Sequence, residues 1–110
     1  MKVPNYEQAI IKSDKLTKYL LNFEHPKGGS KAKFFKIHGY DLSNFEQLAK
    51  ELIRIINENE VNEILSTSFG INYSVVAHLE SKTLQNPLIK TVWSISEERD
   101  IPHFVTAYPF

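Results

Sequence analysis

The chain has 110 residues and no cysteine, and 13 lysine and arginine residues balance 13 acidic residues, so its formal net charge is zero. This length is typical of one domain with its own core, so we expect a single domain over residues 1–110. The composition excludes disulfides and thiolate metal sites, and it argues against a protein that coats nucleic acid through many phosphate contacts.

No apolar run approaches the roughly 20 residues that span a bilayer, and the first residues lack an apolar secretory segment. We therefore expect a cytoplasmic protein with no membrane association, and export as part of a larger protein stays open. The charge is unevenly placed, with seven lysines between Lys12 and Lys36 and five glutamates between Glu46 and Glu63. The basic side of the molecule should therefore come from the first third of the chain.

Helical spacing dominates the first half of the chain. An apolar residue at every third or fourth position predicts a helix over residues 14–21, with Ser13 as its cap. Ser30 and Gly39 bracket a second predicted helix over residues 31–37.

A third helix is predicted to begin at Ser43, because Ser43 and Glu46 have the spacing of a capping box. Its apolar stripe is Phe45, Leu48, Ala49, Leu52, Ile55 and Ile56. From Val61 onward, apolar and polar residues alternate instead, which is the period of strands.

We expect four strands, the first two joined as a hairpin at Gly70. They cover residues 62–68, 71–79, 88–96 and 103–108. Helices followed by a meander predict an α+β fold, in which N-terminal helices pack on one face of a C-terminal antiparallel sheet of about four strands.

The main candidate site is the stretch from His25 to Lys33. Glycines before a helix start leave backbone N–H groups free, and the helix dipole adds positive charge, so this place suits an anion. Lysines are unfavourable there unless an anion binds, and the predicted first turn holds Lys31. The phosphate-binding candidates are Lys27, Gly28, Gly29, Ser30 and Lys33. A solvated lysine face with a simple glycine turn also explains these residues, and their spacing is not that of a P-loop.

His25 has the residue type for proton transfer near neutral pH, although a single loop histidine is often incidental. We interpret His38 as the C-terminal cap of the second helix. His78 and His103 lie on or beside predicted strands, without partners at the spacing of metal ligands. We therefore expect no metal and no other cofactor.

The predicted strands also carry hydroxyl groups. Thr106 and Tyr108 should share one face of the last strand while Val105 and Ala107 face the core. Either residue could serve a site or be an ordinary exposed strand residue. Trp93 is best interpreted as a core aromatic.

Several of these segments match a known pattern. They are Lys15-Leu16, Tyr19-Leu20-Leu21-Asn22, His25-Pro26, Gly28, Ser30-Lys31-Ala32-Lys33-Phe34-Phe35, Thr91-Val92-Trp93 and Thr106-Ala107-Tyr108-Pro109. Over nearly its whole length the chain resembles a small bacterial domain family of unknown function, found alone or at the C-terminus of larger secreted and phage-type proteins. Its order of elements is in turn similar to the barnase/EndoU/colicin/RelE superfamily of metal-independent ribonuclease toxins.

This resemblance implies a site that cleaves RNA through its 2′-OH. His25 would be the base or acid, and Lys31, assisted by Lys33, would place positive charge on the phosphate. Tyr108, with Thr106 or Thr91, would orient the phosphate or donate a proton. An enzyme of this kind should hold His25, Lys31 and Tyr108 in one pocket.

The implied partners are RNA, including tRNA, and an immunity or antitoxin protein that neutralises the toxin. The sequence does not define the oligomeric state. A second reading is a non-catalytic antitoxin-like or adaptor domain that binds nucleic acid or an acidic protein through its basic helix pair. A stable domain without chemistry is the third reading.

Overall fold

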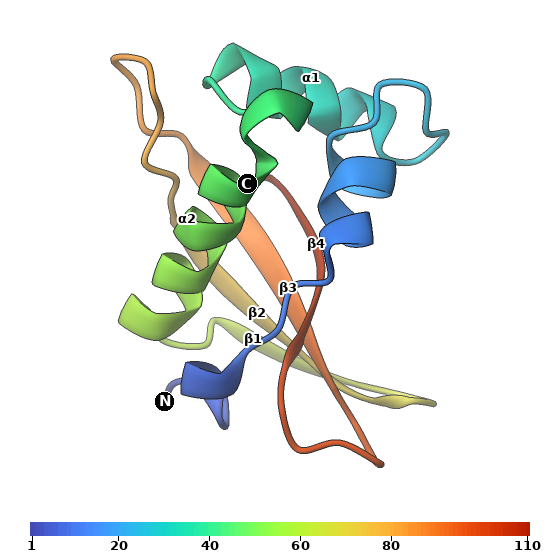
Figure 1. Ribbon diagram of the computed structural model, residues 1–110. Coiled ribbons are helices and arrows are strands. Elements are labelled where there is room, and N and C mark those ends of the chain that lie inside the picture. Colours follow the sequence, from blue (N-terminus) through green and yellow to red (C-terminus); the bar gives the residue numbers. More distant parts are fainter.

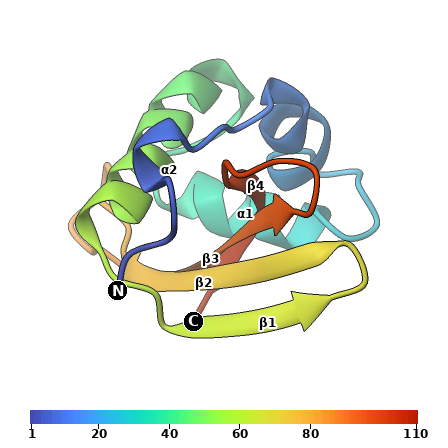
Figure 2. The ribbon, with the colours of Figure 1, turned by 90° about the horizontal axis from the view of Figure 1, so that it is seen from below.

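The computed structural model describes residues Met1–Phe110 and places helices on one face of a four-stranded antiparallel sheet (Figure 1). The strands are β1 (Glu63–Thr67), β2 (Gly70–His78), β3 (Leu88–Ser96) and β4 (His103–Pro109), and their spatial order follows the chain. Figure 2 shows that the helices all lie on the same side of this sheet. The predicted α+β fold, with its meander and N-terminal helices, is therefore confirmed.

Three helical elements form the covering layer. They are the π-helix η2 (Lys15–Leu20), α1 (Gly29–Ile37) and α2 (Phe45–Glu58). Two short 3₁₀ turns, η1 (Tyr6–Gln8) and η3 (Leu42–Asn44), precede η2 and α2. None of the helices has the length and apolarity to cross a lipid bilayer.

The predicted N-terminal caps of the three helices were wrong. The element η2 follows Asp14 without a side-chain capping bond, and α1 begins at Gly29, so Ser30 lies inside its first turn. The expected box of Ser43 and Glu46 is replaced by one around Asp41 at the start of η3. Because a carboxylate is a stronger acceptor than a hydroxyl, Asp41 accepts the Ser43 N–H at 2.9 Å and also the Ser43 hydroxyl.

The core lies between the sheet and the helical layer, with buried side chains from η2, α1 and α2. Trp93 is fully buried on β3, and its ring meets Phe104 of β4 edge to face with centroids 5.3 Å apart. The predicted stripe of α2 supplies the opposite wall through Leu48, Leu52, Ile55 and Ile56, which are all buried. The interpretation of Trp93 as a core aromatic is therefore confirmed.

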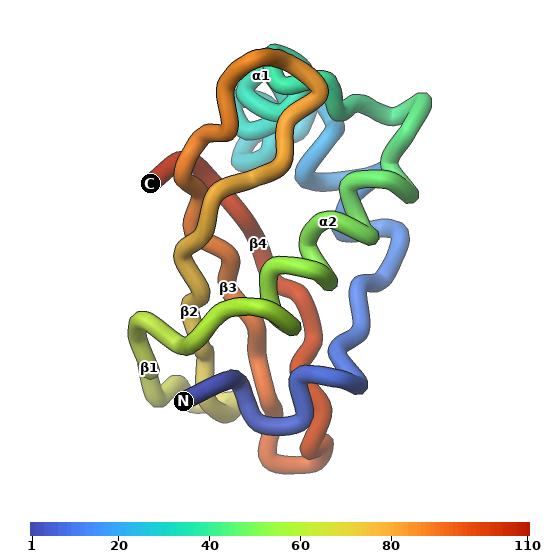
Figure 3. Tube along the Cα trace, turned by 90° about the vertical axis from the view of Figure 1, so that its left-hand side faces the viewer, coloured from blue at the N-terminus to red at the C-terminus, as the bar shows by residue number.

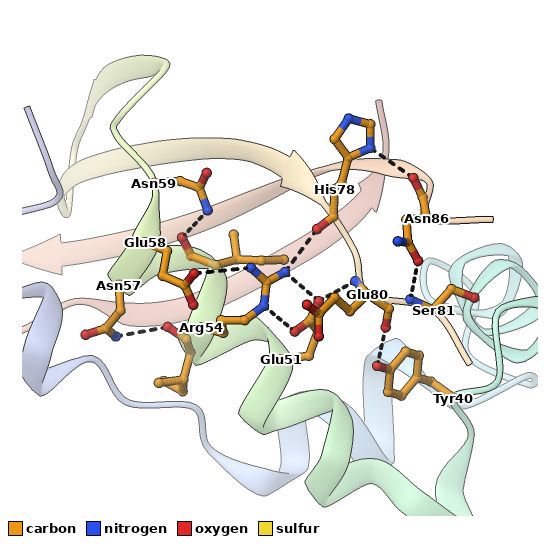
Figure 4. A network of polar contacts seen from close by, with 12 residues as sticks. Tyr40, Glu51, Arg54, Asn57, Glu58, Asn59, His78, Glu80, Ser81 and Asn86 are labelled. Carbon is orange, nitrogen blue, oxygen red and sulfur yellow. Dashed lines mark hydrogen bonds and ion pairs between the residues drawn. The ribbon is translucent and has the colours of Figure 1, made fainter. Parts of the chain in front are cut away.

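A buried ion pair attaches α2 to the end of β2 (Figure 4). Glu51 is only 6% exposed, and Arg54 donates to its two carboxylate oxygens at 2.6 and 2.8 Å. Arg54 also donates to the His78 carbonyl at 3.1 Å, and the Glu80 N–H donates to Glu51. Every hydrogen-bonding group of the Glu51 carboxylate therefore has a partner, which offsets the cost of burying its charge.

The loop between β2 and β3 reaches back to α1, as the trace in Figure 3 shows. The Lys82 N–H donates to the carbonyl of His38 at 3.0 Å. His38 is the C-terminal cap residue of α1, as predicted. This contact holds the far end of α1, while its first turn packs near β4.

Candidate active site

The last strand returns to the start of α1 and brings three polar side chains together. Lys31 Nζ lies 3.2 Å from Thr106 Oγ1, and the Tyr19 hydroxyl lies 2.9 Å from the same oxygen. The Lys31 ammonium also donates a hydrogen bond to the Tyr19 hydroxyl. We call Tyr19, Lys31 and Thr106 the lysine triad. Its members come from η2, α1 and β4, so only the folded chain assembles it.

Aromatic rings flank the Lys31 ammonium on two sides. Its Nζ lies 4.9 Å from the Tyr19 ring centroid and 5.8 Å from that of Tyr108. A cation in such a position is held by the ring electrons as well as by its hydrogen bonds. An ammonium has three N–H groups, and Tyr19 and Thr106 accept two of them, so one remains for a ligand.

A backbone irregularity in β4 aims Thr106 and Tyr108 at this place. The pairing between β3 and β4 shifts at Val92 and Trp93, which leaves Val105 as the extra residue of a bulge. Phe104 and Ala107, and not Val105, are therefore the buried residues of β4. The predicted sharing of one face by Thr106 and Tyr108 still holds, because they alternate with Ala107.

Two glycines allow the loop to lie directly on η2. A Cβ atom at Gly28 would stand 2.0 Å from the Tyr19 carbonyl oxygen, and one at Gly29 would stand 2.5 Å from that of Phe23. Any larger residue would therefore push the start of α1 away from η2. This close approach is what carries Lys31 over the Tyr19 ring.

The ring of His25 is fixed by the same loop. Its Nδ1 accepts the backbone N–H groups of Lys27 and Gly28, each at 3.0 Å. The ring meets Tyr19 edge to face, with centroids 5.0 Å apart. Because Nδ1 is an acceptor, the proton of the neutral ring lies on Nε2. In this conformation Nε2 of the neutral His25 ring can donate a hydrogen bond to a ligand but cannot take up a proton.

The hydroxyl of Tyr19 has an altered acidity. Partial burial acts to raise its pKa, but hydrogen bonds from Lys31 and Thr106 and the charges of Lys31 and Lys15 outweigh burial, so the pKa is lowered. This shift makes Tyr19 a better proton donor than an ordinary tyrosine. Tyr19 was not predicted as a site residue, because it falls in the apolar stripe of its helix. A half-buried tyrosine hydroxyl nevertheless requires a polar partner, and that requirement was the available signal.

The remaining predicted residues lie in different surroundings. Thr91 is fully buried, where its hydroxyl donates to the Val75 carbonyl and accepts the Trp93 indole N–H, both at 2.9 Å. The structure therefore does not bring Thr91 to the triad. Lys27 and Lys33 are exposed, and their side chains take no part in the contacts around Lys31. Ser30 is exposed in the first turn of α1.

Residues 2–110 match the family described as "Domain of unknown function (DUF6883)". The chain belongs to this family. A search of curated proteins finds no significant match to this DUF6883 chain. Among solved structures, it is similar to a chain in the "Contact-dependent growth inhibition toxin - immunity protein complex from Klebsiella pneumoniae 342". The TM-score is 0.70 and the sequence identity 11%, over 92% of this chain and 99% of that chain. At this identity the likeness shows a shared fold.

Proposed function

We propose that this DUF6883 domain is a toxin-type, metal-independent ribonuclease that acts through the lysine triad. The observation that carries the proposal is the Lys31 ammonium, bound by hydroxyls from two other elements and left with one free N–H. Such a cation is preorganised to meet charge that develops on a phosphate during the reaction. The fold shared with a chain of a toxin–immunity complex supports the toxin class.

The reaction would be an attack of an RNA 2′-oxygen on the adjacent phosphorus. The O2′–P bond forms and the P–O5′ bond breaks, which leaves a 2′,3′-cyclic phosphate and a 5′-hydroxyl. Lys31 would neutralise the non-bridging oxygens of the transition state, and Thr106 and Tyr108 would hold the ammonium in place. DNA lacks the 2′-OH and would not be cleaved by this route.

The leaving 5′-oxygen needs a proton, and Tyr19 is the best placed donor. Its pKa is lowered from the ordinary tyrosine value, which eases release of the proton. The His25 Nε2–H would donate a hydrogen bond to a phosphate oxygen. The 2′-OH proton would pass to solvent water, because His25 Nδ1 could accept it only after releasing its two backbone donors.

A toxin of this class would act in the cytoplasm of a target cell and would require an immunity protein in the cell that makes it. The structural neighbour is a chain of a toxin–immunity protein complex, and this supports a protein partner for the present chain. A cheap first observation is growth of bacteria that express the domain. We expect toxicity from the wild type and normal growth with Lys31→Ala.

The test is incubation of purified protein with total RNA in EDTA, beside His25→Ala and Lys31→Ala. We expect cleavage by the wild type and a loss on the order of 10²-fold in rate with Lys31→Ala. Lys33→Ala is the matched control, because Lys33 is an exposed lysine on the same helix outside the triad. No cleavage by the wild type, or equal cleavage by all variants, would reject the proposal. RNA binding without cleavage would instead indicate the adaptor reading.

A further inference from the structure

A recess lined by basic side chains lies beside the lysine triad, at the N-terminal end of β4. It has a volume of about 250 Å³ and an apolar floor that includes Phe104. Its polar lining is Lys12, Lys15, Arg99, His103, Ser94 and Ser96. We call this feature the basic recess.

The N-terminal segment builds one wall of the recess. Ile10 joins the edge of β4 as an isolated parallel bridge to His103, in which the Ile10 N–H donates to Pro102 and the Phe104 N–H donates to Ile10, both at 2.9 Å. The chain then continues along this edge into η2. Lys12 and Lys15 are thereby carried next to β4 from a segment about 90 positions earlier in the sequence.

The cations of the recess have no counter-charge in the protein. Four basic side chains line it and no carboxylate does. The nearby Asp14 pairs with Lys18 at 3.6 Å, and none of the ion pairs of the structure involves Lys12, Lys15 or Arg99. Like charges that converge without a partner repel each other, so an anion bound here would stabilise the arrangement.

The hydrogen bonding and the pKa of His103 are consistent with a recess that lacks acidic groups. Arg99 lies 3.1 Å from His103 Nε2, and since arginine can only donate, that nitrogen is the acceptor. Burial, followed by the positive charges of Arg99 and Lys12, lowers the pKa of His103. The acidic residues of the same turn, Glu97, Glu98 and Asp100, are exposed and form no ion pair with the recess.

The recess and the lysine triad lie next to each other along β4. Lys15 lines the recess and also places its Nζ 5.8 Å from the Tyr19 ring centroid. Val105, at the bulge, lines the recess and directly precedes Thr106. A strand rises about 3.3 Å per residue, so His103 and Thr106 are separated by about 10 Å along β4. A flexible chain of phosphates can therefore contact both places at once.

We propose that the basic recess is a phosphate-binding subsite for the single-stranded RNA backbone that flanks the cleaved bond. The inference rests on the proposed function, which it extends by naming where the substrate strand runs. The forked guanidinium of Arg99 and the hydroxyls of Ser94 and Ser96 match the acceptor oxygens of a phosphate. The concave shape and the position next to the triad favour RNA over the acidic surface of a protein partner.

The test is fluorescence anisotropy with a 2′-O-methyl RNA oligonucleotide, which binds but cannot be cleaved. The variant is Lys12→Ala/Arg99→Ala, and the matched control is Lys50→Ala/Lys82→Ala, which removes two exposed charges from distant elements. We expect the recess variant to bind at least about 10-fold more weakly than the control. Each phosphate contact to a single strand adds about 0.7 to the magnitude of the slope of log affinity against log salt. Loss of the two contacts should therefore reduce that magnitude by about 1.4.

Cleavage kinetics separate the subsite from the catalytic proposal. With a long RNA, the recess variant should raise KM and leave kcat unchanged, and with a dinucleotide it should behave as the wild type does. Unchanged affinity and salt slope in a variant with wild-type circular dichroism would overturn the inference. Binding of polyglutamate, in place of RNA, that depends on Lys12 and Arg99 would overturn it in favour of a protein surface. If the protein binds RNA through Lys12 and Arg99 but cleaves no RNA, the inference of an RNA-binding subsite stands and the nuclease proposal is rejected.

Discussion

Lys31 Nζ and Thr106 Oγ1 lie 3.2 Å apart although 75 positions separate the two residues in the sequence. This contact joins the first turn of α1 to the last strand and closes the lysine triad around the Tyr19 hydroxyl. It makes the geometry of the proposed site depend on the whole fold, because η2, α1 and β4 must all be in place. Substitutions at these residues therefore have measurable consequences.

The first prediction concerns the acidity of Tyr19. Ultraviolet titration of tyrosinate, with Tyr19→Phe subtracted from the wild type, should give a pKa below the usual value of about 10. In Lys31→Met the hydrogen bond and the charge are lost while burial remains, so the pKa of Tyr19 should rise. A pKa that does not change between wild type and Lys31→Met would show that Lys31 does not control this hydroxyl.

The same group should set the alkaline limb of the activity profile. If protonated Tyr19 is the acid, cleavage should fall as pH rises through the pKa of Tyr19, since the donor form is then lost. Tyr19→Phe should be slower by about 10²-fold near neutral pH and should lack this limb. Thr17→Ser, two residues away on the same helix, is the control for local disturbance. An alkaline limb that survives in Tyr19→Phe would assign the acid to another residue.

The second prediction is the tautomer of His25. Because its Nδ1 accepts two backbone N–H groups, the neutral ring should carry its proton on Nε2. Long-range ¹H–¹⁵N spectra of the wild type, assigned with His25→Ala, distinguish the two neutral forms. A predominant Nδ1–H form would contradict the loop geometry and would restore His25 as the candidate base.

The third prediction separates Thr91 from the site. Thr91→Val leaves the Trp93 indole N–H without its acceptor in the core, so the free energy of unfolding should fall by about 1–3 kcal/mol. Cleavage measured at a temperature where the variant is folded should be unchanged. A large loss of kcat in a folded Thr91→Val protein would mean that Thr91 serves the phosphate after all. Thr91→Ser keeps the hydroxyl and should lose less stability.

The fourth prediction concerns the ion pair of α2. Arg54→Ala strands the buried carboxylate of Glu51, which should cost roughly 2–3 kcal/mol, less than a fully buried pair because Arg54 itself is partly exposed. Chemical denaturation measures this, with Lys50→Ala on the same helix as the control, for which we expect a change within about 0.5 kcal/mol. Equal stability of the two variants would show that water already solvates Glu51.

The apolar spacing of α2, β2 and β3 was enough to predict the fold, although β1 is exposed along its whole length and α1 is only weakly amphipathic. The helix caps could not be predicted as reliably, since several polar residues compete at each start. Asp41 is the stronger acceptor and forms the cap, whereas the capping-box spacing of Ser43 and Glu46 favoured Ser43 in the sequence. Strand ends moved by only a residue or two, which is the usual uncertainty of a boundary.

The site was partly visible in the sequence. Lys31, Thr106 and Tyr108 were predicted from the anion-site pattern and the family resemblance, and the structure brings them together. Tyr19 was hidden in a core stripe, and Thr91 was misleading because a strand hydroxyl next to Trp93 is equally suited to a core hydrogen bond. The basic recess could not be foreseen, since it requires the bridge between Ile10 and His103.

The rate of RNA cleavage by Lys31→Met, measured in EDTA, is the direct test of Lys31 as the cation of the proposed site. Methionine keeps an unbranched side chain beside the Tyr19 and Tyr108 rings and removes the charge, and Lys33→Met provides the matched control. We predict that the wild type and Lys33→Met release products with 2′,3′-cyclic phosphate ends, and that Lys31→Met does so about 10²-fold more slowly. Equal rates for Lys31→Met and the wild type would show that cleavage does not depend on the Lys31 charge.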